Sequence, residues 1–161
     1  DQEKKLYQDA STFKEYLENR HKRKVEELEH HYKTNQIWFE QIITPEVIEF
    51  VKEHPEVLSC VIKDDKLYVT KIPYDIHNFL ESDTDILKRY YACHCSFVRE
   101  NILTKTEDIP QEWCYCSGGF AKHPFETILD QELDIKLIST PLNGDHLCRF
   151  EIDLSTIEYK K

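Results

Sequence analysis

Two closely spaced pairs of cysteines constrain the fold more than any other feature of this sequence. CHC occupies positions 93–95 and CYC occupies positions 114–116, so four of the six cysteines in a 161-residue chain lie in two short segments. Thiols supplied from two separate segments are typical of a metal centre in a small domain. If the pairs act together, the chain must fold so that the two segments meet.

The acidic charge of the chain excludes several classes of partner. It has 31 acidic and 21 basic residues, and the net charge of −10 repels phosphate backbones and anionic lipids. No stretch approaches a membrane span, and DQEKKLYQDA lacks the basic and apolar regions of a signal peptide. We therefore expect a cytoplasmic protein that binds neither nucleic acid nor membrane. In that compartment thiols stay reduced, which favours metal ligands or reactive thiols over structural disulfides.

The first third of the chain has a helical pattern. Apolar residues recur at helical intervals over 12–33, and Thr12 followed by Glu15 has the form of a capping box. We predict further helix over 36–43, and a new helix that starts at Thr44 and Pro45. Because the apolar stripe of the long helix is thin, this helix either packs on its own domain or pairs with a copy of itself in a homodimer.

The remainder of the chain mixes strands and helices. Two β-branched runs in 57–73 predict a hairpin, and two strands are predicted over 133–140 and 147–154, around a turn that contains Gly144. Helical patterns fill 76–103 and 120–130. We expect a mixed α/β fold with an antiparallel sheet flanked by helices over residues 57–161. Residues 1–56 form a helical N-terminal extension, and both parts belong to one compact unit.

Zinc is the ion that the cysteines favour. It binds thiolates tetrahedrally, and Cys93, Cys95, Cys114 and Cys116 supply four of them. Strand alternation puts Cys148 on the core side of the sheet, where it could replace one of the four. His94 could also ligate in place of a cysteine, or serve as an acid and base. Cys60 has the pattern of an inert buried thiol.

A catalytic interpretation uses the same atoms. A thiol at the start of a helix has a lowered pKa, and Cys114 or Cys116 qualifies by its position before the predicted 120–130 helix. His94 or His123 could act as the base, and the Gly118–Gly119 pair could offer backbone N–H groups to an oxyanion. A third interpretation is a redox switch that forms disulfides across the two pairs.

The cationic residues near the cysteines are candidates for binding a ligand. Arg99 lies five residues after His94 in a mostly apolar stretch and could clamp a carboxylate, and Lys122 is a second candidate. Arg149 is predicted to face solvent, because it alternates with the core residues of its strand.

The final third of the chain resembles two related families. CYCSGGFAKHPFETILDQELDIKLISTPLNGDHLCRFEIDL is similar to the 4-vinyl reductase-type small-molecule-binding domains and to the related 2-aminothiazoline-4-carboxylate hydrolase family. The CHC and CYC pairs resemble the second, mostly uncharacterised family more closely. Both end in a helix, a strand, a Gly-Asp turn and a strand that begins with cysteine. The matching residues are Gly144, Asp145, Cys148, Phe150 and Ile152.

The resemblance implies an α/β domain with a pocket between sheet and helices. In sensory members of the first family, cysteines and an acidic residue hold zinc beside this pocket, and Cys114 and Cys148 fall where two of those cysteines would. Leu137 and Thr140 stand in place of the acidic residue and a further cysteine. We therefore expect a zinc-binding, small-molecule-binding or sensing domain. A hydrolase of a small sulfur or nitrogen heterocycle is the alternative, with Cys116 and His94 as catalytic residues.

Overall fold

The computed structural model describes residues 2–161 and confirms a mixed α/β fold with an antiparallel sheet. The helices are α1 (Gln2–Asp9), α2 (Phe13–Lys33), α3 (Pro45–Glu53), α4 (Ile76–Glu81), α5 (Asp85–Ala92), α6 (Ser96–Thr104) and α7 (Tyr115–Leu129). The strands are β1 (Val61–Lys63), β2 (Lys66–Thr70), β3 (Ile135–Ser139) and β4 (Arg149–Asp153). Short 3₁₀ helices, η1 (Gln111–Cys114) and η2 (Pro141–Asn143), precede α7 and follow β3.

The strands form one sheet in the order β1-β2-β4-β3, with every neighbouring pair antiparallel. The predicted hairpin over 57–73 is confirmed, because β1 and β2 pair around a turn in which Asp64 and Asp65 both have positive φ. Aspartate tolerates this left-handed conformation better than most residues do. The predicted strands on either side of Gly144 are confirmed as β3 and β4.

One face of the sheet carries the core. Leu67 pairs with Ile152 and Val69 pairs with Phe150, and all four side chains are buried on the same face. The first half of α2 and the C-terminal half of α7 bury aromatic and aliphatic side chains against this face. Each large apolar side chain buried in this way contributes about 1.5–3 kcal/mol before the entropy of ordering is subtracted.

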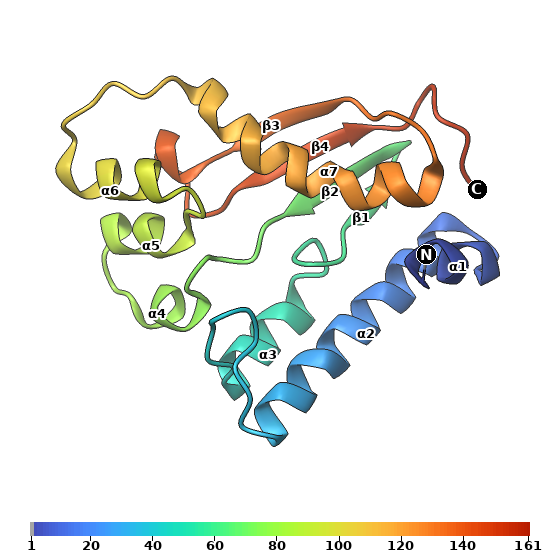
Figure 1. The fold of residues 1–161 in the computed structure, drawn as a ribbon, viewed down its shortest axis with the longest axis horizontal. Coiled ribbons are helices and arrows are strands. Elements are labelled where there is room, and N and C mark those ends of the chain that lie inside the picture. Colours follow the sequence, from blue (N-terminus) through green and yellow to red (C-terminus); the bar gives the residue numbers. More distant parts are fainter. Residues whose placement is uncertain (1) are drawn as a thin grey trace.

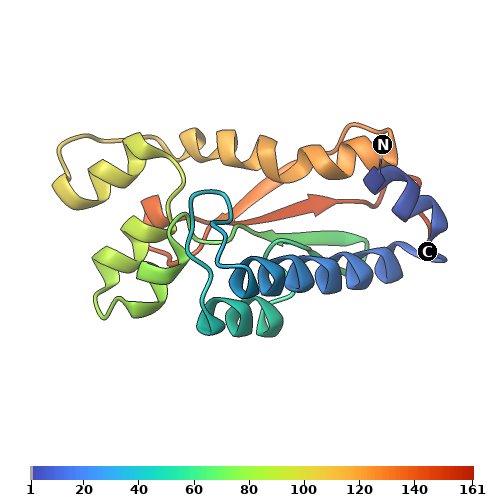
Figure 2. The ribbon, with the colours of Figure 1, turned by 60° about the horizontal axis from the view of Figure 1, so that its bottom comes forward.

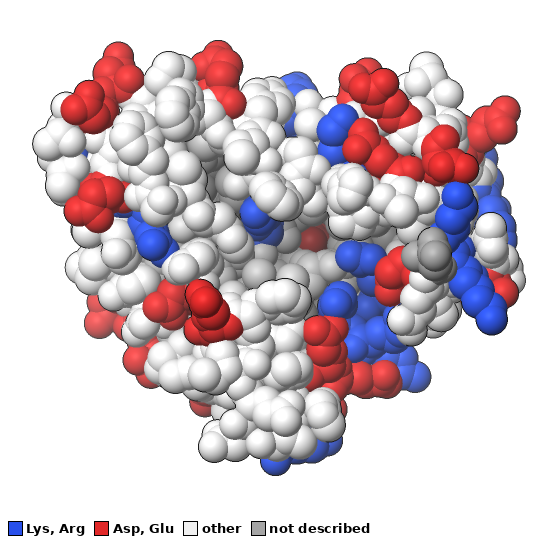
Figure 3. Space-filling view, in the orientation of Figure 1, with Lys and Arg blue, Asp and Glu red and all other residues white. Residues whose placement is uncertain are grey.

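The helices are arranged around a hollow. Figures 1 and 2 show α7 running along β3 and β4, α2 on the side of β1, α4 to α6 gathered at one end of the sheet, and α1 at the other end. Figure 3 shows a hollow in the centre of this face, between α7 and α2, with Lys and Arg side chains at its edge. No helix within residues 2–161 is long and apolar enough to cross a membrane.

The long N-terminal helix begins as the sequence predicts. The Thr12 hydroxyl accepts a hydrogen bond from the backbone N–H of Glu15 at 3.1 Å, and the Glu15 carboxylate accepts one from the N–H of Ser11 at 2.7 Å. Two orphan N–H groups near the helix start are thereby satisfied. The apolar stripe of α2 is buried within this chain: Phe13 and Tyr16 lie in the sheet core, and Leu28 packs with α3 and α4. The N-terminal helices therefore share cores with the rest of the domain.

The prediction of a helix over 36–43 is wrong. Trp38 and Gln41 instead form an antiparallel bridge around Phe39 and Glu40, which both have positive φ. The buried Trp38 ring donates a hydrogen bond to Glu27 at 2.6 Å, and the Gln41 side chain accepts one from the first N–H of α4 at 3.1 Å. These tertiary contacts override the weak helical pattern.

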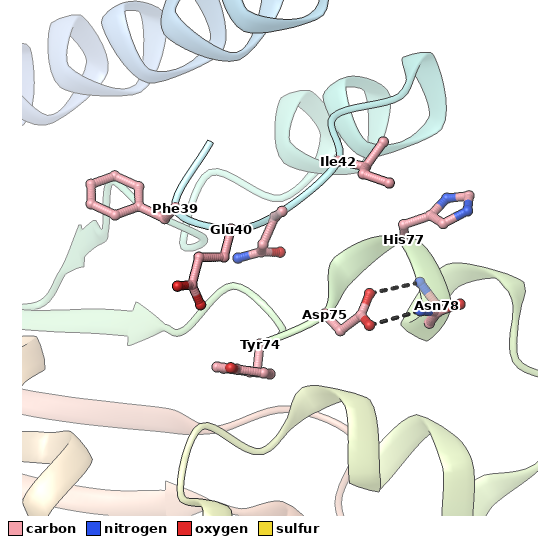
Figure 4. A pocket seen from close by; sticks show the side chains of 8 residues that line it. Phe39, Glu40, Ile42, Tyr74, Asp75, His77 and Asn78 are labelled. Carbon is pink, nitrogen blue, oxygen red and sulfur yellow. Dashed lines mark hydrogen bonds between the residues drawn. The ribbon is translucent and has the colours of Figure 1, made fainter. Parts of the chain in front are cut away.

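A small cavity lies under this loop. It measures about 190 Å³ and is bounded by the loop and the start of α4. Figure 4 shows Asp75 bonded to Asn78 on its far side, with Phe39 pointing away from both. The Phe39 side chain is 78 % exposed, so it fills neither the cavity nor the core.

Candidate functional site

The two cysteine segments occupy the connections at one end of the sheet. The CHC segment (93–95) is the link between α5 and α6, and Cys93 caps the C-terminus of α5. Cys114 closes η1 and precedes α7, so that Cys116 lies in the first turn of that helix. Cys148 comes from the strand side, immediately before β4.

These segments meet around one cavity of about 470 Å³. Five of the six cysteines line it, which is the convergence that the paired spacing predicts. Cys60 lies elsewhere and is buried in the core between α2 and α7, as an inert thiol should be. The lining residues are Lys71, Cys93, His94, Cys95, Ser96, Trp113, Cys114, Cys116, Ser117, Phe120, Thr140 and Cys148.

Burial keeps three of the cavity thiols protonated. Desolvation raises the pKa of Cys93 to about 11 and that of Cys148 to about 12, and it raises the pKa of Cys114 as well. Nearby cysteines raise each of these pKa values further, because a second thiolate close by would repel the first. At neutral pH these three thiols are therefore neutral in the metal-free cavity. Cys116 is exposed at its rim.

Thr140 joins the cysteines at the floor of the cavity. Its side chain is buried, and its hydroxyl lies 3.1 Å from the Cys114 sulfur. The same hydroxyl accepts a hydrogen bond from the Leu142 N–H at 3.2 Å, which holds it in place at the start of η2. Leu137 is buried beside Cys114 and Cys148 and supplies no ligand atom. Leu137 and Thr140, the two positions at which this sequence differs from the families it resembles, thus both lie beside the cavity cysteines.

His94 is neutral in this environment. Desolvation lowers its pKa to about 4, and the neighbouring Lys71 charge acts in the same direction. Its Nε2 atom lies 2.6 Å from the carbonyl oxygen of Ile72. Because a carbonyl only accepts hydrogen bonds, the ring proton must be on Nε2, and Nδ1 keeps a free lone pair.

Lys71 also lines the cavity, and the sequence analysis did not predict it as a site residue. It follows β2 by one residue and continues the inward alternation of Leu67 and Val69, so its side chain is directed to the face that α7 covers. Desolvation lowers the pKa of its ammonium group, and the nearby Cys148, Cys116 and Cys93 oppose this shift. The signal in the sequence was a lysine at an inward position of a β-branched strand.

The remaining predicted residues lie outside the cavity lining. The Arg99 guanidinium stacks over Tyr74, 4.2 Å from the ring centroid. Lys122 pairs with Glu126 at 2.7 Å and donates to the Leu133 carbonyl at 2.8 Å, which ties α7 to the segment before β3. His123 is exposed on α7.

Two predictions about polar positions need correction. Arg149 is not simply solvent-facing, because its guanidinium makes two bonds of 2.7 and 2.8 Å to the Glu56 carboxylate. Helix α7 begins at Tyr115 instead of 120, so Gly118 and Gly119 lie inside it. Their N–H groups are directed along the helix to carbonyls four residues earlier, and they cannot form the predicted oxyanion cradle. A Cβ on Gly118 would lie 3.2 Å from the Phe150 ring, so close packing explains this glycine.

The donor set of the cavity suits zinc by its chemistry, since it offers five thiols and one imidazole lone pair. Their positions are less favourable. Across the described part of the chain, no three His, Cys, Asp or Glu side chains are placed closely enough to hold a metal ion. Zinc binding would therefore require thiol side chains to turn toward one another.

Fold and cavity together define an α+β domain with a cysteine-lined cavity at the end of an antiparallel sheet. The chain matches a family of unknown function, DUF6144, over residues 58–158, which is more than half of its length, and it belongs to that family. The matched region includes all four strands and all six cysteines. No curated protein and no solved structure matches the chain.

Proposed function

We propose that this protein binds a small molecule in its cysteine-lined cavity and that the cavity thiols take up Zn²⁺. The observation that carries the proposal is the convergence of five cysteines, from three separate segments, on one cavity of about 470 Å³. This volume lies within the range of roughly 300–1,000 Å³ that is usual for small-molecule sites. Trp113 and Phe120 supply apolar lining, and Thr140 and His94 supply polar groups.

The thiols that we expect to hold the ion are Cys93, Cys95, Cys114 and Cys116, with Cys148 as the alternative. Zinc binds thiolates, so uptake by neutral buried thiols releases protons and becomes stronger as the pH rises. When bound, the ion would partly neutralise the thiolates that hold it. In the proposal His94 is the ligand that could replace one of these thiols. It would bind through Nδ1, because its Nε2 is bonded to the Ile72 carbonyl.

A second candidate function is hydrolysis of a small sulfur or nitrogen heterocycle. The observation that favours it is the position of Cys116, which is exposed at the cavity rim in the first turn of α7. In this candidate function Cys116 is the nucleophile, and His94, a neutral base that lines the same cavity, accepts its proton. Burial raises the pKa of the Cys114 thiol, which disfavours Cys114 as the nucleophile.

Metal analysis combined with thiol counting tests the proposal. Protein purified reduced and without a histidine tag should contain about one zinc per chain, with most cavity thiols reactive only after chelation. Cys95→Ser should lose most of the metal, whereas the matched control Cys60→Ser should keep it, because Cys60 lies outside the cavity. Absence of metal together with six freely titrating thiols would overturn zinc binding. If fewer than six thiols titrate and the missing thiols reappear after addition of reductant, the result would indicate the redox switch instead.

A further inference from the structure

The ammonium group of Lys71 has no partner of opposite charge. Among residues 2–161, no carboxylate lies within salt-bridge distance of its Nζ atom, and no oxygen accepts a hydrogen bond from it. Its Nζ atom lies over the Phe120 ring, 6.0 Å from the ring centroid. Partly buried cations normally have a counter-ion or several acceptors, because the lost hydration must be replaced. The missing partner of Lys71 is therefore a candidate ligand group.

Lys71 lies where two cavities meet. It lines the cysteine cavity, and together with Phe120 it also lines a second cavity of about 180 Å³ between β2 and α7. The wall of the second cavity is mainly apolar and is formed by Leu58, Val69, Ile72, Ala121, Pro124 and Phe125. In Figure 3 this region lies in the hollow between α7 and α2. A molecule that contacts Lys71 therefore has an apolar cavity next to it.

The other cation of the second cavity is already paired. Arg20 donates to the Glu3 carboxylate at 3.0 Å and to the Tyr16 hydroxyl at 3.2 Å. Its Nε also approaches the Leu58 carbonyl at 3.4 Å. Among the described residues that line the two cavities, Lys71 is thus the one cation without an ionic partner. A single free cation matches a singly charged acid better than a doubly charged phosphate.

We propose that Lys71 binds the acid group of an amphipathic carboxylate whose apolar part occupies the second cavity. This inference rests on the proposed small-molecule function and specifies the class of ligand. Octanoate has the required combination of one carboxylate and a flexible apolar chain. Octanol has the same chain without the charge, and acetate has the charge without the chain.

Calorimetric titration with these three probes, at low ionic strength and neutral pH, tests the proposal on the full reduced chain. Octanoate should bind at least about tenfold more tightly than octanol, since a charge-assisted bond contributes about 1.5–3 kcal/mol. Octanoate should also bind more tightly than acetate. Lys71→Gln should abolish the preference of octanoate over octanol, and Lys71→Arg should keep most of it. Lys136→Gln, an exposed lysine of β3, is the control for the change in net charge.

Several results would overturn the inference. Equal binding of octanoate and octanol by the wild-type chain excludes the anion site, and equal binding of acetate and octanoate excludes use of the apolar cavity. A preference retained in Lys71→Gln would assign the charge recognition to another residue. If no probe binds, the inference fails, and zinc binding is still judged by the metal and thiol analysis. Lys71→Gln should remain folded, because it removes a buried charge that lacks a partner.

Discussion

The Nε2 atom of His94 lies 2.6 Å from the backbone carbonyl of Ile72, which joins the CHC connection to the segment after β2. The contact fixes the tautomer of the ring and holds it at the cavity edge. It also explains how Cys93 and Cys95 are held near a strand that is distant in sequence. An imidazole that is partly buried beside Lys71 remains neutral under ordinary conditions.

The metal-free protein should lose stability in mild acid because of His94. Its pKa is about 4 in the folded chain and 6.5 ordinarily, so between these values the unfolded chain binds a proton that the folded chain does not. The free energy of unfolding should therefore fall as the pH is lowered from 6.5 to 4, by on the order of 2–3 kcal/mol. Denaturant unfolding at a series of pH values measures this fall. It should become clearly smaller in His94→Gln and remain in the exposed control His123→Gln.

Chelation should destabilise the zinc-loaded protein. If the cavity thiols hold zinc, metal binding adds to the folding free energy, and a chelator should lower the melting temperature of the wild type. Cys114→Ser should melt lower than the wild type and should no longer respond to chelator. Differential scanning fluorimetry with and without chelator provides the comparison. A Cys114→Ser variant that melts like the wild type and keeps its metal would exclude Cys114 as a ligand.

The two glycines of α7 should respond in opposite directions. A Cβ on Gly119 would meet no atom within 4 Å, so Gly119→Ala should raise stability by about 0.5–1 kcal/mol through helix propensity. A larger side chain on Gly118 would collide with Phe150, so Gly118→Val should destabilise by about 1–3 kcal/mol. Thermal unfolding of the two variants is sufficient. Stabilisation by Gly118→Val would show that α7 does not pack closely on β4.

The turn at Phe39 and Glu40 should be open to stabilisation. Both residues have positive φ, which costs roughly 1–2 kcal/mol per residue for ordinary side chains. The double variant Phe39→Asn, Glu40→Gly places the residues that this turn prefers and should raise the free energy of unfolding by about 1–2 kcal/mol. Phe39→Ser is the control, because it removes the exposed ring without relieving the backbone. If Phe39→Ser raised the free energy of unfolding by the same amount, the stabilisation would come from removal of the exposed Phe39 ring and not from relief of the backbone.

Local chemistry made much of the fold predictable. The hairpin at Asp64 and Asp65, the strand pair around Gly144, and the helix starts at Thr12 and Thr44 follow from alternation, turn residues and caps. The paired cysteines also indicated that their segments converge. These features were readable because each depends on residues that are neighbours in the chain.

Most of the helices and strands, and the thiols that line the cavity, could therefore be predicted from neighbouring residues alone. Two other features depend on the tertiary structure. Trp38 donates a hydrogen bond to Glu27, so residues 36–43 do not form the predicted helix, and Gly118 packs inside α7 against Phe150. The tertiary structure also decided that Lys71 lies among the cysteines without an acidic partner. The physical reason is that burial, desolvation and pairing depend on segments that are far apart in sequence, and no local pattern records which of them come together.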